Sequence, residues 1–192
     1  MLEESLRYAR HTGDPWPEAC ASMNLGVVYG LLGKLEQSLI MHQACLPTFR
    51  DRPDMPNTAS TLVNIGTTLV RLGDFEEALP PLEESLELFR SLGYKLGMSI
   101  ALTELATVTR RRGDLDRAQL LIDECMDCLQ DVDSAFYRAP ALLELGAIAD
   151  ARGDYRAALA RYREALQIAV KIEDKIATRR AFDSRVAHYR EK

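Results

Sequence analysis

Residues 64–74 read NIGTTLVRLGD, and the same pattern returns at a fixed distance on both sides. Forty residues earlier the chain reads NLGVVYGLLGK (24–34), and 40 residues later ELATVTRRRGD (104–114). A fourth copy, ELGAIADARGD, occupies 144–154. Three columns hold only glycine or other small residues: Gly33, Gly73, Gly113 and Gly153; Gly26, Gly66, Ala106 and Gly146; Ser38, Ala78, Ala118 and Ala158. We therefore interpret the chain as an array of 40-residue repeats without insertions.

Each repeat is predicted to contain two helices. Apolar and small residues recur at helical spacing, as in Leu102, Leu105, Val108 and Thr109. The column that precedes each first helix offers N-cap residues, namely Asp14, Asp54, Ser134 and Asp174, although Tyr94 interrupts it. The glycine column at 33, 73, 113 and 153 lies where a helix ends in a left-handed residue, and Asp74, Asp114 and Asp154 follow as new N-caps. The sequence thus predicts an all-α array of about ten antiparallel helices, with two-residue turns inside each repeat and longer links between repeats.

Composition excludes several classes of protein. The formal net charge is −5, which disfavours binding to duplex DNA or to an anionic membrane. No apolar run is long enough for a membrane span, and the N-terminus has no signal-peptide pattern. The four cysteines are irregularly spaced, unlike the disulfide framework of a secreted domain. We expect a cytoplasmic protein with free thiols.

The repeat resembles the tetratricopeptide repeat. The motifs that carry the resemblance are NLGVVY (24–29), NIGTTL (64–69) and ELGAIA (144–149), together with Leu-Gly-Asp or Arg-Gly-Asp in three of the turns. The usual period of that family is 34 residues, so the 40-residue period is a departure, which we expect to lengthen the helices. Longer repeats of this kind are similar to those of the Leu-Gly-Asn-rich adaptors and of LuxR- and AfsR-type bacterial regulators. The resemblance implies a right-handed solenoid that binds proteins.

The period also divides the chain. We predict a half repeat at 1–13, full repeats at 14–53, 54–93, 94–133 and 134–173, and a terminal helix at 174–192, all in one solenoid. The half repeat presents Leu2 and Leu6 with no preceding unit. Residue 1 is then either a boundary within a longer protein, the reading we favour, or this apolar edge is covered in another way, for example by self-association.

No constellation of residues points to an enzyme. Cys125 and Cys128 have the spacing of a redox or zinc pair, but Cys125 shares a column with Cys45, Ser85 and Ala165, as a small core residue would. A zinc site would need two more ligands, for which there is no second such pair. His42 shares a column with Leu82, Ile122 and Tyr162, so we expect it to pack at a helix crossing. We expect neither catalysis, nor a metal, nor a cofactor.

The candidate binding residues lie on the first helices. In tetratricopeptide arrays these helices line a concave groove, and the corresponding columns here hold Asn24, Val27, Asn64, Thr67, Arg71, Thr103, Glu104, Thr107, Arg110, Arg111, Glu144 and Asp150. The two asparagine amides can both donate to and accept from a peptide backbone. The arginines can pair with carboxylates, and the acidic residues further along would fix the direction of the ligand. The alternative is that these polar residues form a solvated helix face.

We therefore expect a scaffold for protein–protein interaction that binds a segment with an acidic stretch. Such a module is typical of a larger signalling or transcriptional regulator. Two alternatives stay open at this stage: an array that senses a small ligand, and an array that associates with itself.

Overall fold

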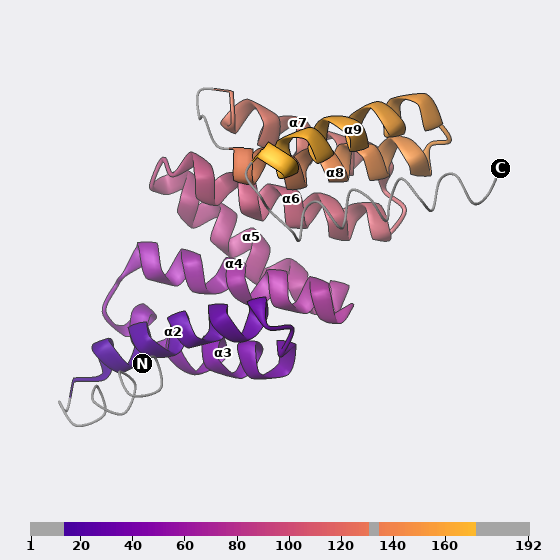
Figure 1. Ribbon diagram of the computed structural model, residues 1–192. Helices are drawn as coiled ribbons and strands as arrows, with labels where there is room; N and C mark the ends of the chain where they lie inside the picture. Colours follow the sequence, from indigo (N-terminus) through magenta and orange to yellow (C-terminus); the bar gives the residue numbers. More distant parts are fainter. Residues whose placement is uncertain (1–13, 131–134, 172–192) are drawn as a thin grey trace. The chain divides into compact units, whose positions relative to one another are not determined.

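The computed structural model describes residues 14–130 and 135–171, and every regular element within these ranges is an α-helix. The helices are α2 (Pro15–Leu31), α3 (Leu35–Asp51), α4 (Met55–Leu72), α5 (Phe75–Ser91), α6 (Lys95–Arg111), α7 (Leu115–Cys128), α8 (Ala135–Ala151) and α9 (Tyr155–Lys171) (Figure 1). The described residues thus contain eight of the ten predicted helices. The half repeat with Leu2 and Leu6 and the terminal helix lie outside the described residues.

Longer helices account for the 40-residue period. In the repeat at 14–53, two helices of 17 residues and two links of three residues make up the whole unit. The predicted long link between repeats is wrong for 52–54 and 92–94, because these links have three residues each. The predicted two-residue turn occurs only between α4 and α5, whereas the turns at 32–34, 112–114 and 152–154 have three residues.

The helix ends follow the predicted signals with one exception. Asp14 Oδ1 accepts a hydrogen bond from the backbone N of Trp16, and Asp54 Oδ1 accepts one from Asn57 N. Asp74 stands at the N-cap of α5 but makes no capping hydrogen bond with its side chain. The turn glycines are left-handed as predicted, with φ of +75°, +93°, +87° and +79° at Gly33, Gly73, Gly113 and Gly153. Ser134 and Asp174 lie outside the described residues.

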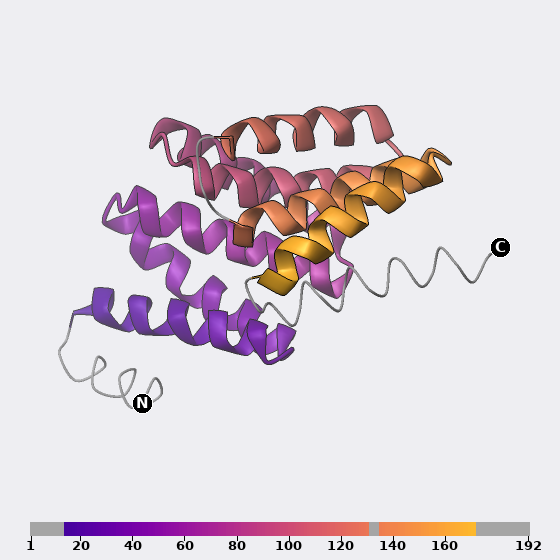
Figure 2. The same ribbon diagram turned by 45° about the horizontal axis from the view of Figure 1, so that its top comes forward.

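The chain divides into two compact units, residues 1–97 and 98–192. In the first unit α2 packs on α3 and α4 packs on α5, while α3 also packs on α4. In the second unit α7 packs on α8 and α8 packs on α9; both views show α8 (orange) alongside α9 (yellow) (Figure 1, Figure 2). Each unit is therefore built from helix hairpins packed on their sequence neighbours.

Small residues at the helix crossings let the paired helices approach closely. A Cβ atom placed on Gly26 would lie 2.7 Å from Cε1 of His42, which is 1% exposed. A Cβ atom on Gly66 or Gly146 would overlap a side chain of the second helix, Leu82 or Tyr162. The predicted close crossing is confirmed, as is the packing of His42 within it.

Candidate functional site

The first helices of the first unit form one candidate face. We call it the α2–α4 face and define it by Asn24, Val27 and Leu31 on α2 and Asn64, Thr67 and Arg71 on α4. The residues on each helix are three or four positions apart, so they share one side of that helix. Arg71 connects the two helices, because its Nη1 donates a hydrogen bond of 2.9 Å to the carbonyl oxygen of Gly30. The sequence did not single out Leu31, which is 67% exposed.

The two asparagines of this face have unused hydrogen-bonding capacity. Asn24 is exposed and Asn64 is half-buried. Among the described residues, neither side-chain amide has a hydrogen-bond partner; the bond at Asn64 is from Thr68 Oγ1 to its backbone carbonyl. Each amide can donate and accept at the same time. Both are thus available to a ligand backbone.

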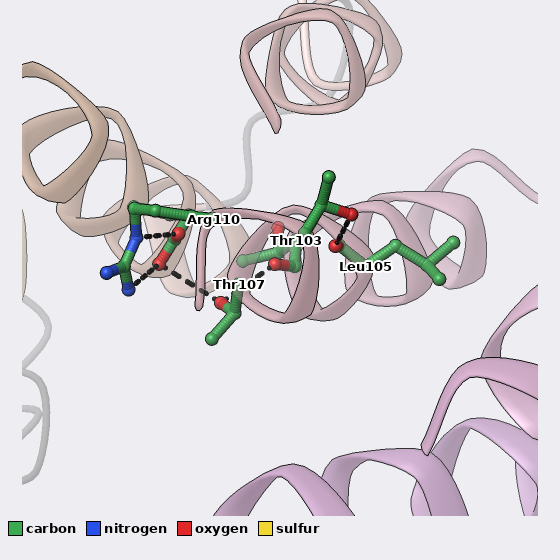
Figure 3. A network of polar contacts seen from close by, with 6 residues as sticks. Thr103, Leu105, Thr107 and Arg110 are labelled. Carbon is green, nitrogen blue, oxygen red and sulfur yellow. Dashed lines mark hydrogen bonds and ion pairs between the residues drawn. The ribbon is translucent and has the colours of Figure 1, made fainter. Parts of the chain in front are cut away.

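The first helices of the second unit carry a different arrangement. We call this the α6–α8 face and define it by Thr103, Glu104, Thr107, Arg110 and Arg111 on α6 and Glu144 and Asp150 on α8. Arg110 forms a two-point ion pair with Glu144, with Nε 2.5 Å from Oε1 and Nη2 3.2 Å from Oε2 (Figure 3). Thr107 Oγ1 lies 3.0 Å from the same Oε2, and the side chain of Glu144 is only 7% exposed.

This ion pair changes the role expected for Arg110 and Glu144. They were predicted to act on a ligand separately, Arg110 by binding its carboxylates and Glu144 by fixing its direction. The structure instead joins them to each other across two helices. Removing either partner would leave a buried charge without compensation, which is costly. Arg110 and Glu144 are therefore bound to each other across α6 and α8.

The remaining residues of the α6–α8 face surround this pair. Arg111 is exposed, while Thr103, Glu104 and Asp150 are half-buried. Thr103 Oγ1 donates back to the carbonyl oxygen of Ser99 at 2.7 Å, so its hydroxyl proton is used within its own helix. Glu104, Arg111 and Asp150 also take part in polar interactions within the protein.

Buried titratable groups near the crossings stay uncharged at neutral pH. Burial raises the pKa of Tyr162 to about 12, with Asp150 and Glu144 acting in the same direction and Arg110 opposing them. Burial lowers the pKa of His42 to about 4. Burial also raises the pKa of the Cys45 and Cys125 thiols to about 11, and all four cysteines are free. A thiol with a raised pKa is a poor nucleophile.

The described residues were also searched for metal sites and for membrane-spanning helices. Within residues 14–130 and 135–171, no group of three or more His, Cys, Asp or Glu side chains is placed to hold a metal ion. In the same ranges, no helix is both long enough and apolar enough to cross a membrane.

Helix hairpins that pack on their sequence neighbours at a constant period define an α-solenoid repeat protein. The family model for the tetratricopeptide repeat matches residues 17–91 and 97–170, and the chain belongs to this family. No curated protein sequence matches the chain.

Solved structures show the same fold. One is BtubC (BKLC) from P. vanneervenii, with a TM-score of 0.73 and 20% identity over 90% of this chain and 72% of that one. Another is the apo form of RapI, with a TM-score of 0.74 and 18% identity over 88% of this chain and 64% of that one. At these identities the likeness concerns the fold alone.

Proposed function

We propose that the chain is a scaffold that binds an extended segment of a partner protein in a concave groove of a right-handed solenoid, lined by the first helices. The observation that carries the proposal is the pair of side-chain amides of Asn24 and Asn64, which stand at the same position of successive repeats and have no hydrogen-bond partner within the described part of the chain. An extended backbone offers a carbonyl and an N–H in alternation, which one amide can satisfy together. Membership of the tetratricopeptide repeat family supports this reading.

We further propose that the chain acts within a larger signalling or transcriptional regulator. The resemblance of its 40-residue repeats to those of LuxR- and AfsR-type regulators supports this role. The chain spans 72% and 64% of the two solved structures described above, so both structural neighbours are longer than the matched region.

Selection of peptides from a random display library on the immobilised full chain tests the proposal. Selected peptides should bind the wild type, and Asn64→Ala should weaken binding by about two- to tenfold, as the loss of a hydrogen bond or two predicts. Gln43→Ala removes an exposed amide from the second helix α3 and is the matched control. Failure to select any peptide, or equal loss of binding in the two variants, would contradict the proposal.

A further inference from the structure

The outward faces of two second helices carry opposite charges. On α9, Arg156 and Arg163 are exposed and stand seven residues apart, so they share one side of the helix. Core residues of α9 such as Ala158 lie two positions further along, which places them on the opposite side. On α5, Glu76 and Glu83 occupy the same two columns of the repeat and are also exposed. We call these two pairs the α9 stripe and the α5 stripe; the first is basic and the second acidic.

The complete helices have the same difference in charge. α5 contains five glutamates and one arginine, whereas α9 contains three arginines, one lysine and one glutamate. In the column of Arg156, the three preceding repeats hold Glu36, Glu76 and Asp116. The basic surface of α9 is thus a departure from the acidic pattern of the preceding second helices.

The stability of α9 itself does not account for its two stripe cations. Arg156 lies in the first turn of the helix, where the positive end of the helix dipole favours carboxylates over cations. Arg161 of the same helix pairs with Glu164 at 3.2 Å. Neither Arg156 nor Arg163 has an ion-pair partner within the described part of the chain. Both guanidinium groups are therefore available to an anionic surface outside the chain.

We propose that the α9 stripe of one copy of this chain docks on the α5 stripe of a second copy. Seven residues of helix span about 10.5 Å, so Arg156 and Arg163 have the same separation along their helix as Glu76 and Glu83. Two arginines can thus meet two carboxylates at once, each in a bidentate pair. Glu76 and Glu83 also take part in interactions within their own chain, but an exposed carboxylate has about four acceptor sites.

The acidic side chains of α7 are a weaker partner for the α9 stripe. α7 has four carboxylates, one fewer than α5, against one arginine. Asp116 already binds Arg152 of its own chain at 2.7 Å, and Asp123 accepts a hydrogen bond of 2.9 Å from Gln119. The proposal therefore places the contact on α5.

The contact joins two different surfaces of the chain. It is heterologous, so each copy in a pair keeps one stripe open to a further copy. Exposed ion pairs are individually weak and are screened by salt. We therefore expect weak, salt-sensitive self-association that increases with protein concentration and does not use the first helices.

Sedimentation equilibrium of the full chain tests this proposal. The weight-average mass should rise with protein concentration at about 0.1 M salt and fall back toward the monomer mass at about 1 M, where the Debye length is only about 3 Å. Reversal of the α9 stripe (Arg156→Glu with Arg163→Glu) should weaken self-association by about tenfold or more, as should reversal of the α5 stripe (Glu76→Arg with Glu83→Arg). An equimolar mixture of the two variants should associate as the wild type does, because every stripe then has a complementary one.

The mixture also controls for net charge. Two Arg→Glu changes take the net charge from −5 to −9 and two Glu→Arg changes take it to −1, so the mixture averages the −5 of the wild type. Lys34→Glu with Arg138→Glu is the matched control for the α9 variant, because it gives the same net charge but changes exposed cations outside the stripe. This control should associate nearly as the wild type does. Melting temperatures verify that all variants are folded.

Three results would overturn the proposal. The first is a wild type that stays monomeric at about 0.1 M salt; binding of poly-glutamate that is lost in the α9 variant would then assign this helix to another acidic partner. The second is a mixture that associates no better than its two components do alone. The third is a loss of association in the control equal to that in the α9 variant. Peptide binding by the first helices is measured separately, so the proposed function is unaffected by any of them.

Discussion

Replacing Gly66 by alanine tests the close helix crossing. In the interior of a helix this change ordinarily stabilises by about 1 kcal/mol, because glycine has the lower helix propensity. Here the new Cβ atom would overlap Cγ and Cδ2 of Leu82, whose side chain is 0% exposed and enclosed by the core. Either Leu82 leaves its rotamer or α4 and α5 move apart, and such overpacking costs about 1–3 kcal/mol. We expect a net loss of up to about 2 kcal/mol in the free energy of unfolding, where propensity alone would give a gain.

Urea unfolding followed by tryptophan fluorescence measures this change. Trp16 is the single tryptophan of the chain and lies in α2, so its emission reports on the first unit. Gly30→Ala is the milder comparison, because the nearest atom to its new Cβ is Ser38 Oγ at 3.3 Å, so this buried hydroxyl, which donates to the Gly26 carbonyl oxygen, would have to shift far less than Leu82. Gly30→Ala should be nearly neutral or stabilising. If Gly66→Ala is as stable as Gly30→Ala, the crossing is not as close as described.

Three further predictions concern buried polar groups. The pKa of His42 is about 4 in the folded state, whereas an unfolded histidine has a pKa near 6.5. The free energy of unfolding should therefore fall as the pH falls from about 6.5 to about 4. His42→Leu introduces the residue that this column holds in the next repeat. Urea unfolding at pH 7 and pH 4 should show that the variant loses roughly 3 kcal/mol less of its free energy of unfolding between the two pH values than the wild type does. An equal loss in both proteins would count against a buried neutral imidazole. Glu144→Leu should destabilise by roughly 3 kcal/mol, and adding Arg110→Met should restore part of that loss; a double variant less stable than the single one would contradict the burial of the pair. Native thiol labelling at pH 7.5 should be limited to the partly exposed Cys20, whereas modification of the other three thiols at the same rate would contradict their burial.

The sequence predicted the repeats well because each helix obeys the same local rules in every copy. Left-handed glycines end the first helices, and a small residue stands where the two helices of a repeat cross. The structural role of a position can therefore be predicted from its column, even where one repeat has a different residue there. His42 illustrates this: as a single histidine it is ambiguous, but its column predicts the crossing position that it occupies. The link lengths were less predictable, because helix ends shift by a residue or two without altering the column pattern.

The ion pair of the second unit was not predicted because its members stand in different columns. Arg110 and Glu144 are 34 residues apart, which is short of the 40-residue period by about one and two-thirds helical turns. They meet only because successive first helices lie side by side. In the repeat at 14–53 the residue at the position of Arg110 is Gly30, and the guanidinium of Arg71 bonds to its carbonyl oxygen instead. A search for opposite charges at this offset, rather than within columns, would have found the pair.

The exposure of apolar side chains on the first helices also depends on how the helices pack on one another. The sequence assigns Val27 to the candidate binding face by its column but does not single out Leu31, because apolar residues at helical spacing usually mark a buried face. The structure leaves both exposed on α2, while the buried positions of that helix are held by smaller side chains such as Ala19 and Ser22. Composition alone does not distinguish an apolar ligand surface from a core stripe.

The crystal structure of the full chain with a peptide from the selected pool tests the central claim most directly. We predict an extended peptide along α2 and α4, with its backbone hydrogen-bonded to the amides of Asn24 and Asn64. A peptide carboxylate should lie within about 3 Å of the Arg71 guanidinium, the range of a charge-assisted hydrogen bond. A peptide bound on the second helices α3 and α5, or one that leaves both asparagine amides without contact, would contradict the account.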